Sequence, residues 1–369
     1  MAVDLRALVP APTGIGVYTR SLLLALARRG GFRLVGLAHR PPHHADELRA
    51  AGVEVAHRRA PLGVLWQQLV LPRELRRVAA DLLWSPITTL PLACPVPAVV
   101  TVHDLSTLLL PETHRLKVRW SVVPFLRPTL ERARVVVADS RATADDLRRH
   151  FPECGPRVRV VHPGIDPEFR PASEGEIAAT RAELGAPRGY VLFAGTLEPR
   201  KNVAGLLDAW ERLRARGVDG VPLLLAGPYG WGGRGLLRRI ERLEPLGVRY
   251  LGRLERQRLV RVVQAARVFA YVSLHEGFGL PPAEALACGV PAVVADRSSL
   301  PEVVGDAGLQ VDPHDPDAIA DAIARLLALD AVAAAAWRER ALRQASRFTW
   351  EAAAAGLAAA FGAALAAPT

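Results

Sequence analysis

The stretch that decides the fold runs from Val268 to Ala295 and reads VFAYVSLHEGFGLPPAEALACGVPAVVA. An apolar run of strand length opens it, and a glycine-rich turn leads into a helix that begins at Pro281-Pro282 and stops at Gly289. A second apolar run, 292–295, closes it. A strand, a helix and a further strand in this order predict a βαβ unit with parallel strands.

The same pattern recurs along the whole chain. Apolar strand-length runs occur at 3–9, 34–38, 53–56, 82–84, 98–102, 135–138, 158–161, 190–194, 223–226, 248–251, 268–272, 292–295 and 308–311. Continuous apolar strands that alternate with helices predict parallel sheets covered on both faces. A polar, proline-containing break at 163–187 separates two sets of runs.

We therefore predict an α/β fold of two doubly wound, Rossmann-like domains, residues 1–170 and 171–347. A ligand site is expected at the carboxyl ends of the strands, in a cleft between the domains. Residues 348–369 follow the second predicted sheet, and we expect them to form a helix that packs back on the first domain.

Composition limits the class of protein. The chain has 369 residues, of which 50% are hydrophobic and 23% charged, as expected for a globular protein of two domains. Lysine and arginine exceed aspartate and glutamate by 47 − 37 = 10, so the chain should attract anions: nucleic acid, an acidic membrane or a phosphorylated substrate. Lys117 and Lys201 are its two lysines, and every other cationic side chain of this kind is arginine.

Cysteines and apolar segments bear on the compartment. Cys94, Cys154 and Cys288 are far apart and lack a C-x-x-C spacing, so neither a disulfide framework nor a zinc site is indicated. The first residues do not resemble a signal peptide, and we expect a cytoplasmic protein. The alanine-rich end, 352–368, is about as long as a marginal membrane span, but its larger apolar residues recur every four positions, which favours a packed amphipathic helix.

Two glutamates flank the glycine-rich turn. Glu276 and Glu284 are separated by seven residues, and the backbone amides of 278–280 lie at or near the start of the predicted helix. Such amides bind phosphate or hydroxyl oxygens. One extended polyhydroxyl ligand would satisfy both acids, although a solvated Glu276 and a Glu284 that only complements the helix dipole are the alternative. The two glycines favour the ligand, because they admit it close to the backbone.

Here the sequence resembles a known family. Glu276 and Glu284, set in EGFGLPPAEA and followed by GVPAVVA, look like the signature of the retaining glycosyltransferases of family 4, also called group 1. The resemblance implies a GT-B fold whose C-terminal domain holds a nucleotide-sugar donor and whose N-terminal domain holds the acceptor. It implies that Glu284 binds the ribose and that Glu276 contacts the transferred sugar and its phosphate, together with the amides of Gly277, Phe278, Gly279 and Leu280.

A second motif, GTLEPRKN at 195–202, follows another predicted strand. Arg200 and Lys201 suit a diphosphate, because charge-assisted hydrogen bonds are stronger than neutral ones. The alternative is a solvated basic turn. The family places a lysine here on the donor diphosphate, and many members carry arginine directly after the glycine, where this chain has Thr196. Whether Arg200 supplies the second charge is therefore a hypothesis.

Two motifs of the first half complete the predicted site. His103 and Asp104 end a strand, and a histidine at this edge beside an acid is well placed to act, although a lone histidine is more often structural. The resemblance implies that His103 contacts the donor sugar, with Asp104 as a supporting neighbour. Gly14 and Gly16 follow the first strand, where the family approaches the acceptor and the donor phosphate. A dinucleotide site is disfavoured, because the third glycine of its motif is absent.

Two other motifs are weaker. Asp315-Pro316-Asp317 has the D-x-D spacing of metal-dependent transferases, but a helix cap at Asp315 explains it better, and we predict no metal site. The stretch 115–127 mixes arginines with tryptophan and valine. A solvated helix face is the default there, and a patch for a membrane surface or a lipid-linked acceptor is the alternative.

The sequence thus predicts a hexosyltransferase that needs no cofactor or metal. Its expected partners are a nucleotide-sugar donor, first of all GDP-mannose, and a glycan or lipid-linked acceptor, with peripheral contact to the inner face of the plasma membrane as an option. A nucleotide-sugar epimerase, a phosphorylase and a non-catalytic sugar-binding protein are the rival interpretations. Nucleic-acid binding has only the net charge in its favour, because no aromatic stacking platform accompanies it.

Overall fold

The computed structural model describes residues 1–10, 13–114, 116–231 and 234–366, without the side chains of 116–121 and 234. The chain divides into two compact units, each with its own sheet. Unit 1 comprises Met1–Gly164 and Phe348–Thr369, and unit 2 comprises Ile165–Arg347. The boundary thus falls a few residues before the expected 170, and the segment 165–170 belongs with unit 2.

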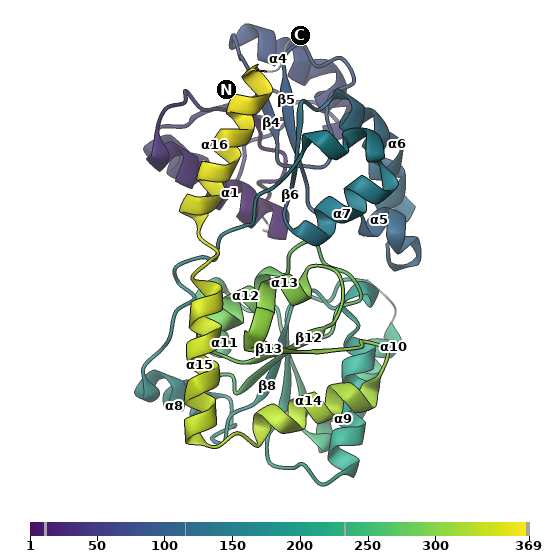
Figure 1. Cartoon of the computed structure of the whole chain (residues 1–369), viewed down its shortest axis with the longest axis vertical. Coiled ribbons are helices and arrows are strands. Elements are labelled where there is room, and N and C mark those ends of the chain that lie inside the picture. Colours follow the sequence, from purple (N-terminus) through teal and green to yellow (C-terminus); the bar gives the residue numbers. More distant parts are fainter. Residues whose placement is uncertain (11–12, 115, 232–233, 367–369) are drawn as a thin grey trace. The chain divides into compact units, whose positions relative to one another are not determined.

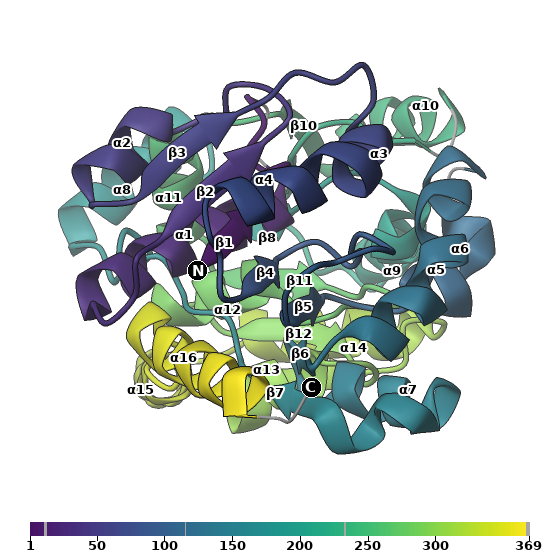
Figure 2. The ribbon, with the colours of Figure 1, turned by 90° about the horizontal axis from the view of Figure 1, so that it is seen from above.

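The sheet of unit 1 has seven parallel strands in the order β3-β2-β1-β4-β5-β6-β7, which can be followed across Figure 2. The strands are β1 Ala2–Asp4, β2 Val35–Ala38, β3 Glu54–His57, β4 Leu83–Ser85, β5 Ala98–Val102, β6 Val135–Ala138 and β7 Val158–Val160. The prediction of a strand over 3–9 was wrong beyond Asp4. There the Asp4 carboxylate accepts a hydrogen bond from the Arg6 amide and pairs with the Arg6 guanidinium, which turns the chain out of the sheet.

Helices connect these strands. The α-helices of unit 1 are α1 Gly14–Arg29, α2 Ala45–Ala50, α3 Gly63–Leu65, α4 Leu71–Arg77, α5 Ser106–Leu109, α6 Leu116–Arg132, α7 Arg141–His150 and α16 Trp350–Ala366. Shorter π and 3₁₀ segments are η1 Trp66–Val70, η2 Pro111–Thr113 and η3 Pro152–Arg157. Because neighbouring strand residues face opposite sides of the sheet, Leu83 and Trp84 belong to different apolar clusters.

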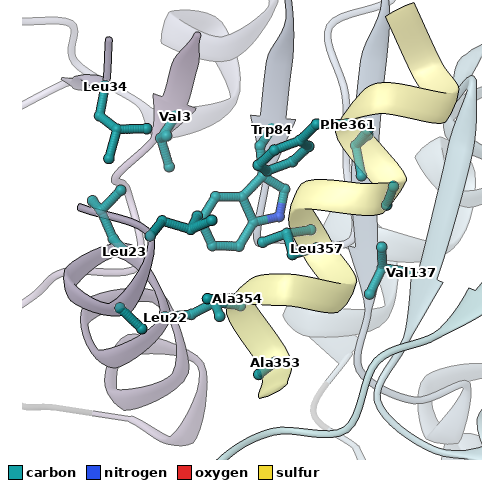
Figure 3. Packing of buried hydrophobic residues seen from close by; sticks show 14 of the residues in the cluster. Val3, Leu22, Leu23, Leu34, Trp84, Val137, Ala353, Ala354, Leu357 and Phe361 are labelled. Atoms are coloured by element: carbon teal, nitrogen blue, oxygen red, sulfur yellow. The ribbon is translucent and has the colours of Figure 1, made fainter. Parts of the chain in front are cut away.

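The C-terminal helix α16 is part of the core of unit 1. It packs beside α1, and Leu357 and Phe361 lie against Trp84 of the sheet, as Figure 3 shows. By length and composition the segment Ala331–Ala366 is apolar enough to cross a membrane, but its α16 half has the buried face of a core helix. Leu365, which the four-residue spacing placed on this face, is instead half exposed.

Unit 2 has a six-stranded parallel sheet in the order β10-β9-β8-β11-β12-β13. Its strands are β8 Val191–Ala194, β9 Leu223–Ala226, β10 Val248–Gly252, β11 Val268–Tyr271, β12 Ala292–Ala295 and β13 Gly308–Val311. The central strands are buried along their whole length, as their apolar runs predict. The strand order reverses between β8 and β11, which makes their carboxyl ends the topological switch point of this sheet.

Helices cover both faces of this sheet, and α9 and α14 lie side by side on one of them (Figure 1). The helices of unit 2 are α8 Glu174–Glu183, α9 Val203–Ala215, α10 Arg234–Arg242, α11 Arg256–Gln264, α12 Leu280–Ala287, α13 Leu300–Val304, α14 Pro316–Leu327 and α15 Ala331–Ala345. Single 3₁₀ turns are η4 Pro199–Lys201, η5 Glu244–Leu246 and η6 Gly305–Ala307. Both sheets therefore confirm the predicted fold class.

Candidate active site

The two predicted donor motifs of unit 2 meet at its switch point. The segment 195–202 follows β8, and the segment 272–279 follows β11, which pairs with β8. The Leu274 amide donates a hydrogen bond to the Arg200 carbonyl oxygen, and Ser273 Oγ lies 3.0 Å from the same oxygen. The segments 195–202 and 272–279, about 75 residues apart in the chain, are thus held together at the Arg200 carbonyl.

Glu276 is the centre of a buried polar cluster. The Lys201 ammonium donates to its Oε1 over 2.6 Å, and Nη1 of Arg200 lies 3.1 Å from its Oε2. Ser273 Oγ also donates to Oε1, and Lys201 donates a second hydrogen bond to the Tyr271 hydroxyl over 2.7 Å. An ammonium has three N–H donors, so a third one stays available to a ligand.

The charges of this cluster are strongly coupled. Burial would raise the pKa of Glu276, but the charges of Arg200 and Lys201 outweigh it and lower the pKa to about 2. Burial and the neighbouring Arg200 lower the pKa of Lys201, against the opposing attraction of Glu276. Arg200 also pairs with Glu198 over 3.0 Å. The cluster therefore carries two cations and two carboxylates at one sheet edge.

The turn after Glu276 is braced by two serines between β12 and α13. Ser298 Oγ accepts a hydrogen bond from the Glu276 amide, and the buried Ser299 hydroxyl lies 2.7 Å from the Phe278 carbonyl. Gly279 has φ of 104°, a conformation that favours glycine, and a Cβ there would come within 2.8 Å of a Leu300 methyl carbon. The Phe278 side chain is buried, so what it offers a ligand is backbone.

Replacing Ser299 with alanine should loosen this turn. The hydroxyl bridges the carbonyls of Glu276 and Phe278, and a lost hydrogen bond of this kind costs about 1 kcal/mol. We expect donor affinity to fall by roughly fivefold, with a smaller change in turnover. Calorimetric titration with the donor checks this, and Ser346→Ala, which removes a hydroxyl from the surface end of α15, is the control. Equal affinities would show that the brace does not shape the site.

Glu284 lies near the middle of α12, nearly buried, with Arg256 as its charged neighbour. Nη1 of Arg256 is 3.6 Å from its Oε1. Burial raises the pKa of Glu284 to about 8, helped by the charge of Asp166 and opposed by that of Arg256. The sequence reasoning missed both neighbours. Asp166 precedes a proline in what looked like a linker, and Arg256 is one of many arginines.

In unit 1, His103 is held by both ring nitrogens. Nδ1 lies 2.6 Å from Oδ2 of Asp139, and Nε2 lies 2.7 Å from the Pro86 carbonyl oxygen. The Pro86 carbonyl and an ionised Asp139 are both acceptors, so this geometry favours a ring with a proton on each nitrogen. Burial would lower the pKa of His103, but the charge and hydrogen bond of Asp139, with the Pro86 carbonyl and the charge of Asp104, together outweigh it and raise the pKa.

Asp139 was not among the predicted site residues, although the sequence held a signal for it. Val102 of β5 pairs with Ala138 of β6, so the residues that follow, His103 and Asp139, are neighbours by register. An acid directly after the next strand was therefore the natural partner of His103. The predicted contact between His103 and a donor sugar stays a prediction, because the donor cluster belongs to the other unit.

The other predicted residues of unit 1 have local structural roles. The Asp104 carboxylate accepts hydrogen bonds from the amide and the hydroxyl of Ser106. The Gly16 amide donates to Thr13 Oγ1, and a Cβ on Gly16 would come within 2.9 Å of the Ala7 carbonyl. Around Gly14 nothing lies within 4 Å of an added Cβ. These contacts explain the helix start and leave the predicted ligand roles untested.

The weaker motifs are resolved in part. Asp315 caps α14 by accepting from the amides of Asp317 and Ala318, as predicted. Among the described residues, no group of three or more His, Cys, Asp or Glu side chains is placed to hold a metal ion. Of the basic stretch, Arg115 lies outside the described residues, and Arg127 pairs with Glu153.

Comparison with known proteins agrees with this geometry. The family described as Glycosyl transferases group 1 matches residues 177–344, and the family described as Glycosyltransferase Family 4 matches residues 12–169. The O-antigen chain mannosyltransferase B of Escherichia coli is 39% identical over 261 residues, which cover 69% of this chain and 67% of that protein. The D-inositol 3-phosphate glycosyltransferase of a Nocardioides strain is 36% identical, and the match spans 60% of this chain and 52% of that enzyme.

Solved structures share the architecture. Anabaena HepE, in complex with UDP and glucose, has a TM-score of 0.76 at 21% identity and covers 98% of both chains. WaaG, a glycosyltransferase involved in lipopolysaccharide biosynthesis, has a TM-score of 0.75 at 16% identity, with 97% of this chain and 98% of that one covered. The protein is therefore a GT-B enzyme. It belongs to the family 4, or group 1, glycosyltransferases, which transfer a sugar from a nucleotide-sugar donor.

Proposed function

We propose that the enzyme moves mannose from GDP-mannose to a hydroxyl of a glycan or lipid-linked acceptor, with retention of the anomeric configuration and without a metal ion. The donor site is assigned from one observation: Lys201, Arg200 and Glu276 form a charged cluster at the switch point of unit 2. The mannosyltransferases among the relatives support the sugar, at 39% and 30% identity. We also place the reaction in the cytoplasm, which agrees with three free cysteines.

The leaving group is the main demand of this reaction. The bond between the anomeric carbon and the diphosphate breaks through an oxocarbenium-like transition state, and negative charge grows on the departing phosphate. Lys201, with a donor to spare and its position fixed by Tyr271 and Glu276, is placed to neutralise that charge. The amides of 277–280 would add hydrogen bonds at the start of α12.

The acceptor hydroxyl must also lose a proton. Both ring nitrogens of His103 lie against acceptors, Asp139 and the Pro86 carbonyl, so His103 is not the base in our proposal. The leaving phosphate oxygen, on the same face of the sugar as the incoming hydroxyl, takes the proton in our proposal. The carboxylate of Glu284 would accept hydrogen bonds from the two ribose hydroxyls.

A donor screen tests the proposal. Thermal unfolding would be followed with GDP-mannose and with UDP, ADP and dTDP sugars, because a ligand at 100 times its dissociation constant stabilises by about 2.7 kcal/mol. We expect the largest stabilisation with GDP-mannose, and release of GDP that requires an acceptor glycan. Release of GDP without any acceptor sugar product, or a preference for another nucleotide, would overturn the assignment of substrate.

The proposal also predicts independence from divalent cations. With the charge of the leaving diphosphate neutralised by Lys201 and Arg200, added EDTA should change turnover by less than about twofold. The measurement is GDP release with and without chelator, with Mg²⁺ or Mn²⁺ added back as the control. A loss that added metal restores would contradict the proposed role of the two cations.

A further inference from the structure

One guanidinium in unit 2 connects three carboxylates. Arg256 is the first residue of α11, and its Nη2 lies 2.7 Å from Oδ2 of Asp166. Its Nε lies 3.4 Å from Oε2 of Glu168, and its Nη1 lies 3.6 Å from Oε1 of Glu284. Its Cζ is also 4.6 Å from the centroid of the buried Phe169 ring.

The carboxylates come from two different parts of unit 2. Asp166 and Glu168 lie in the segment 165–170, with which unit 2 begins, and Glu284 lies on α12. The C-terminal end of α11 also contacts this segment, because the side-chain amide of Gln264 donates a hydrogen bond to the Arg170 carbonyl over 2.8 Å. Both ends of the segment 165–170 are thus bound to α11. Arg256, at the start of α11, contacts this segment and Glu284 at the same time.

We infer that Arg256 is a positioning residue that holds the Glu284 carboxyl group in place for the donor and favours its charged form, and that it links the segment 165–170 to the donor site. The inference rests on the proposed role of Glu284 toward the donor ribose. Arg256 belongs to none of the motifs of the sequence, and it precedes in the chain the turn and helix that carry Glu276 and Glu284. Its proposed role rests on its contacts with three carboxylates.

The electrostatics give Arg256 and Asp166 opposite effects. Three carboxylates share this one guanidinium, so without it Glu284 would keep its proton up to a higher pH. Asp166 works the other way, because its charge raises the pKa of Glu284. Cys288, one turn further along α12, has a pKa raised by burial and by Glu284, and Arg338 of α15 acts on Cys288 in the opposite sense.

A hydrogen-bonding role makes the charge state matter. A carboxylate accepts hydrogen bonds from two hydroxyl groups, whereas a protonated acid must use one oxygen as a donor. Donor affinity should therefore rise with pH as Glu284 ionises. A purely structural role of Arg256 would leave the pH dependence of donor affinity unchanged in its variants.

The experiment compares Arg256→Gln with Asp166→Asn in the full-length protein. The side-chain carboxyl ¹³C resonance of Glu284, assigned by its absence in Glu284→Gln, is followed from pH 5 to 10. We expect the midpoint to rise by about one pH unit or more in Arg256→Gln and to fall in Asp166→Asn. Arg256→Lys keeps the charge and should stay near the wild type. Arg258→Gln, on the same helix and paired with Glu183, is the matched control.

Affinity for GDP and GDP-mannose is then measured by calorimetry between pH 6 and pH 9. We expect the affinity profile of Arg256→Gln to move to higher pH, that of Asp166→Asn to lower pH, and that of Glu284→Gln to be flat. Midpoints that stay in place, or that move in the same direction in both variants, would overturn the inference. If the wild type binds neither nucleotide, the proposed donor is wrong, and the resonance of Glu284 still decides the role of Arg256.

Discussion

Glu276→Gln is expected to lower turnover by about 100- to 1000-fold, the range for removing one group that organises charge at a transition state. Glutamine has nearly the same shape but no charge, so Lys201 and Arg200 lose the carboxylate that sets their positions. Initial rates of GDP release, at saturating GDP-mannose and acceptor, give the size of the loss. The donor KM should change less than the turnover number.

The same substitution should weaken the fold. Removing one partner of a buried ion pair costs about 3–5 kcal/mol, because the remaining charge stays buried and unpaired. The wild type should lose stability as pH falls from the ordinary glutamate pKa toward 2, since Glu276 has its pKa lowered to about 2 in the folded protein. In Glu276→Gln this residue no longer titrates, so its contribution to the loss of stability at low pH should be absent.

A control separates the role of Glu276 from the general loss of a carboxylate. Glu198 also pairs with Arg200, but it makes no contact with Lys201 among the described interactions. Glu198→Gln should therefore lower turnover by far less. Equal effects of the two substitutions, or full activity of Glu276→Gln in a folded protein, would remove Glu276 from the reaction.

Lys201→Ala is expected to weaken donor binding by tenfold or more. The ammonium is nearly buried, and a charge-assisted hydrogen bond to a phosphate contributes about 1.5–3 kcal/mol. Affinity for GDP should fall as much as affinity for GDP-mannose, because both carry the diphosphate. Calorimetric titration of the two nucleotides measures this directly.

Lys201→Arg tests whether charge alone is sufficient. A planar guanidinium cannot reproduce the compact ammonium between the Tyr271 hydroxyl and Glu276, so affinity should stay well below that of the wild type. The control is Arg340→Ala, because this guanidinium stacks on Trp337 of its own helix α15 and has no contact with the cluster among the described residues. Unchanged nucleotide affinity in Lys201→Ala would show that Lys201 serves the fold and not the donor.

The sequence predicted the architecture because buried parallel strands are apolar along their whole length. Each predicted run from 34 onward overlaps a strand of one of the two sheets. The first run, 3–9, was predicted too long. Asp4 and Arg6 form an ion pair there, and the apolar residues around them made the whole run look like a strand. A local ion pair of this kind changes the direction of the chain without changing its hydrophobic pattern.

The donor motifs were predictable for a similar reason. Arg200, Lys201 and Glu276 lie in the segments that follow two central strands of the sheet, and parallel strands bring their carboxyl ends to one edge. Arg256 and Asp166 were not predictable, because neither follows a strand in a recognisable motif. Their importance comes from a contact between segments roughly 90 residues apart, which no local pattern records.

The place of α16 in unit 1 has a consequence for how the chain is made. This helix completes the apolar core around Trp84, yet it is synthesised after every element of unit 2. Unit 2 is complete in sequence once Arg347 has left the ribosome, whereas the first sheet still lacks one of its covering helices at that moment. The unit whose translation begins first is therefore completed after unit 2, and until then the Trp84 side of its sheet exposes apolar surface, which favours aggregation.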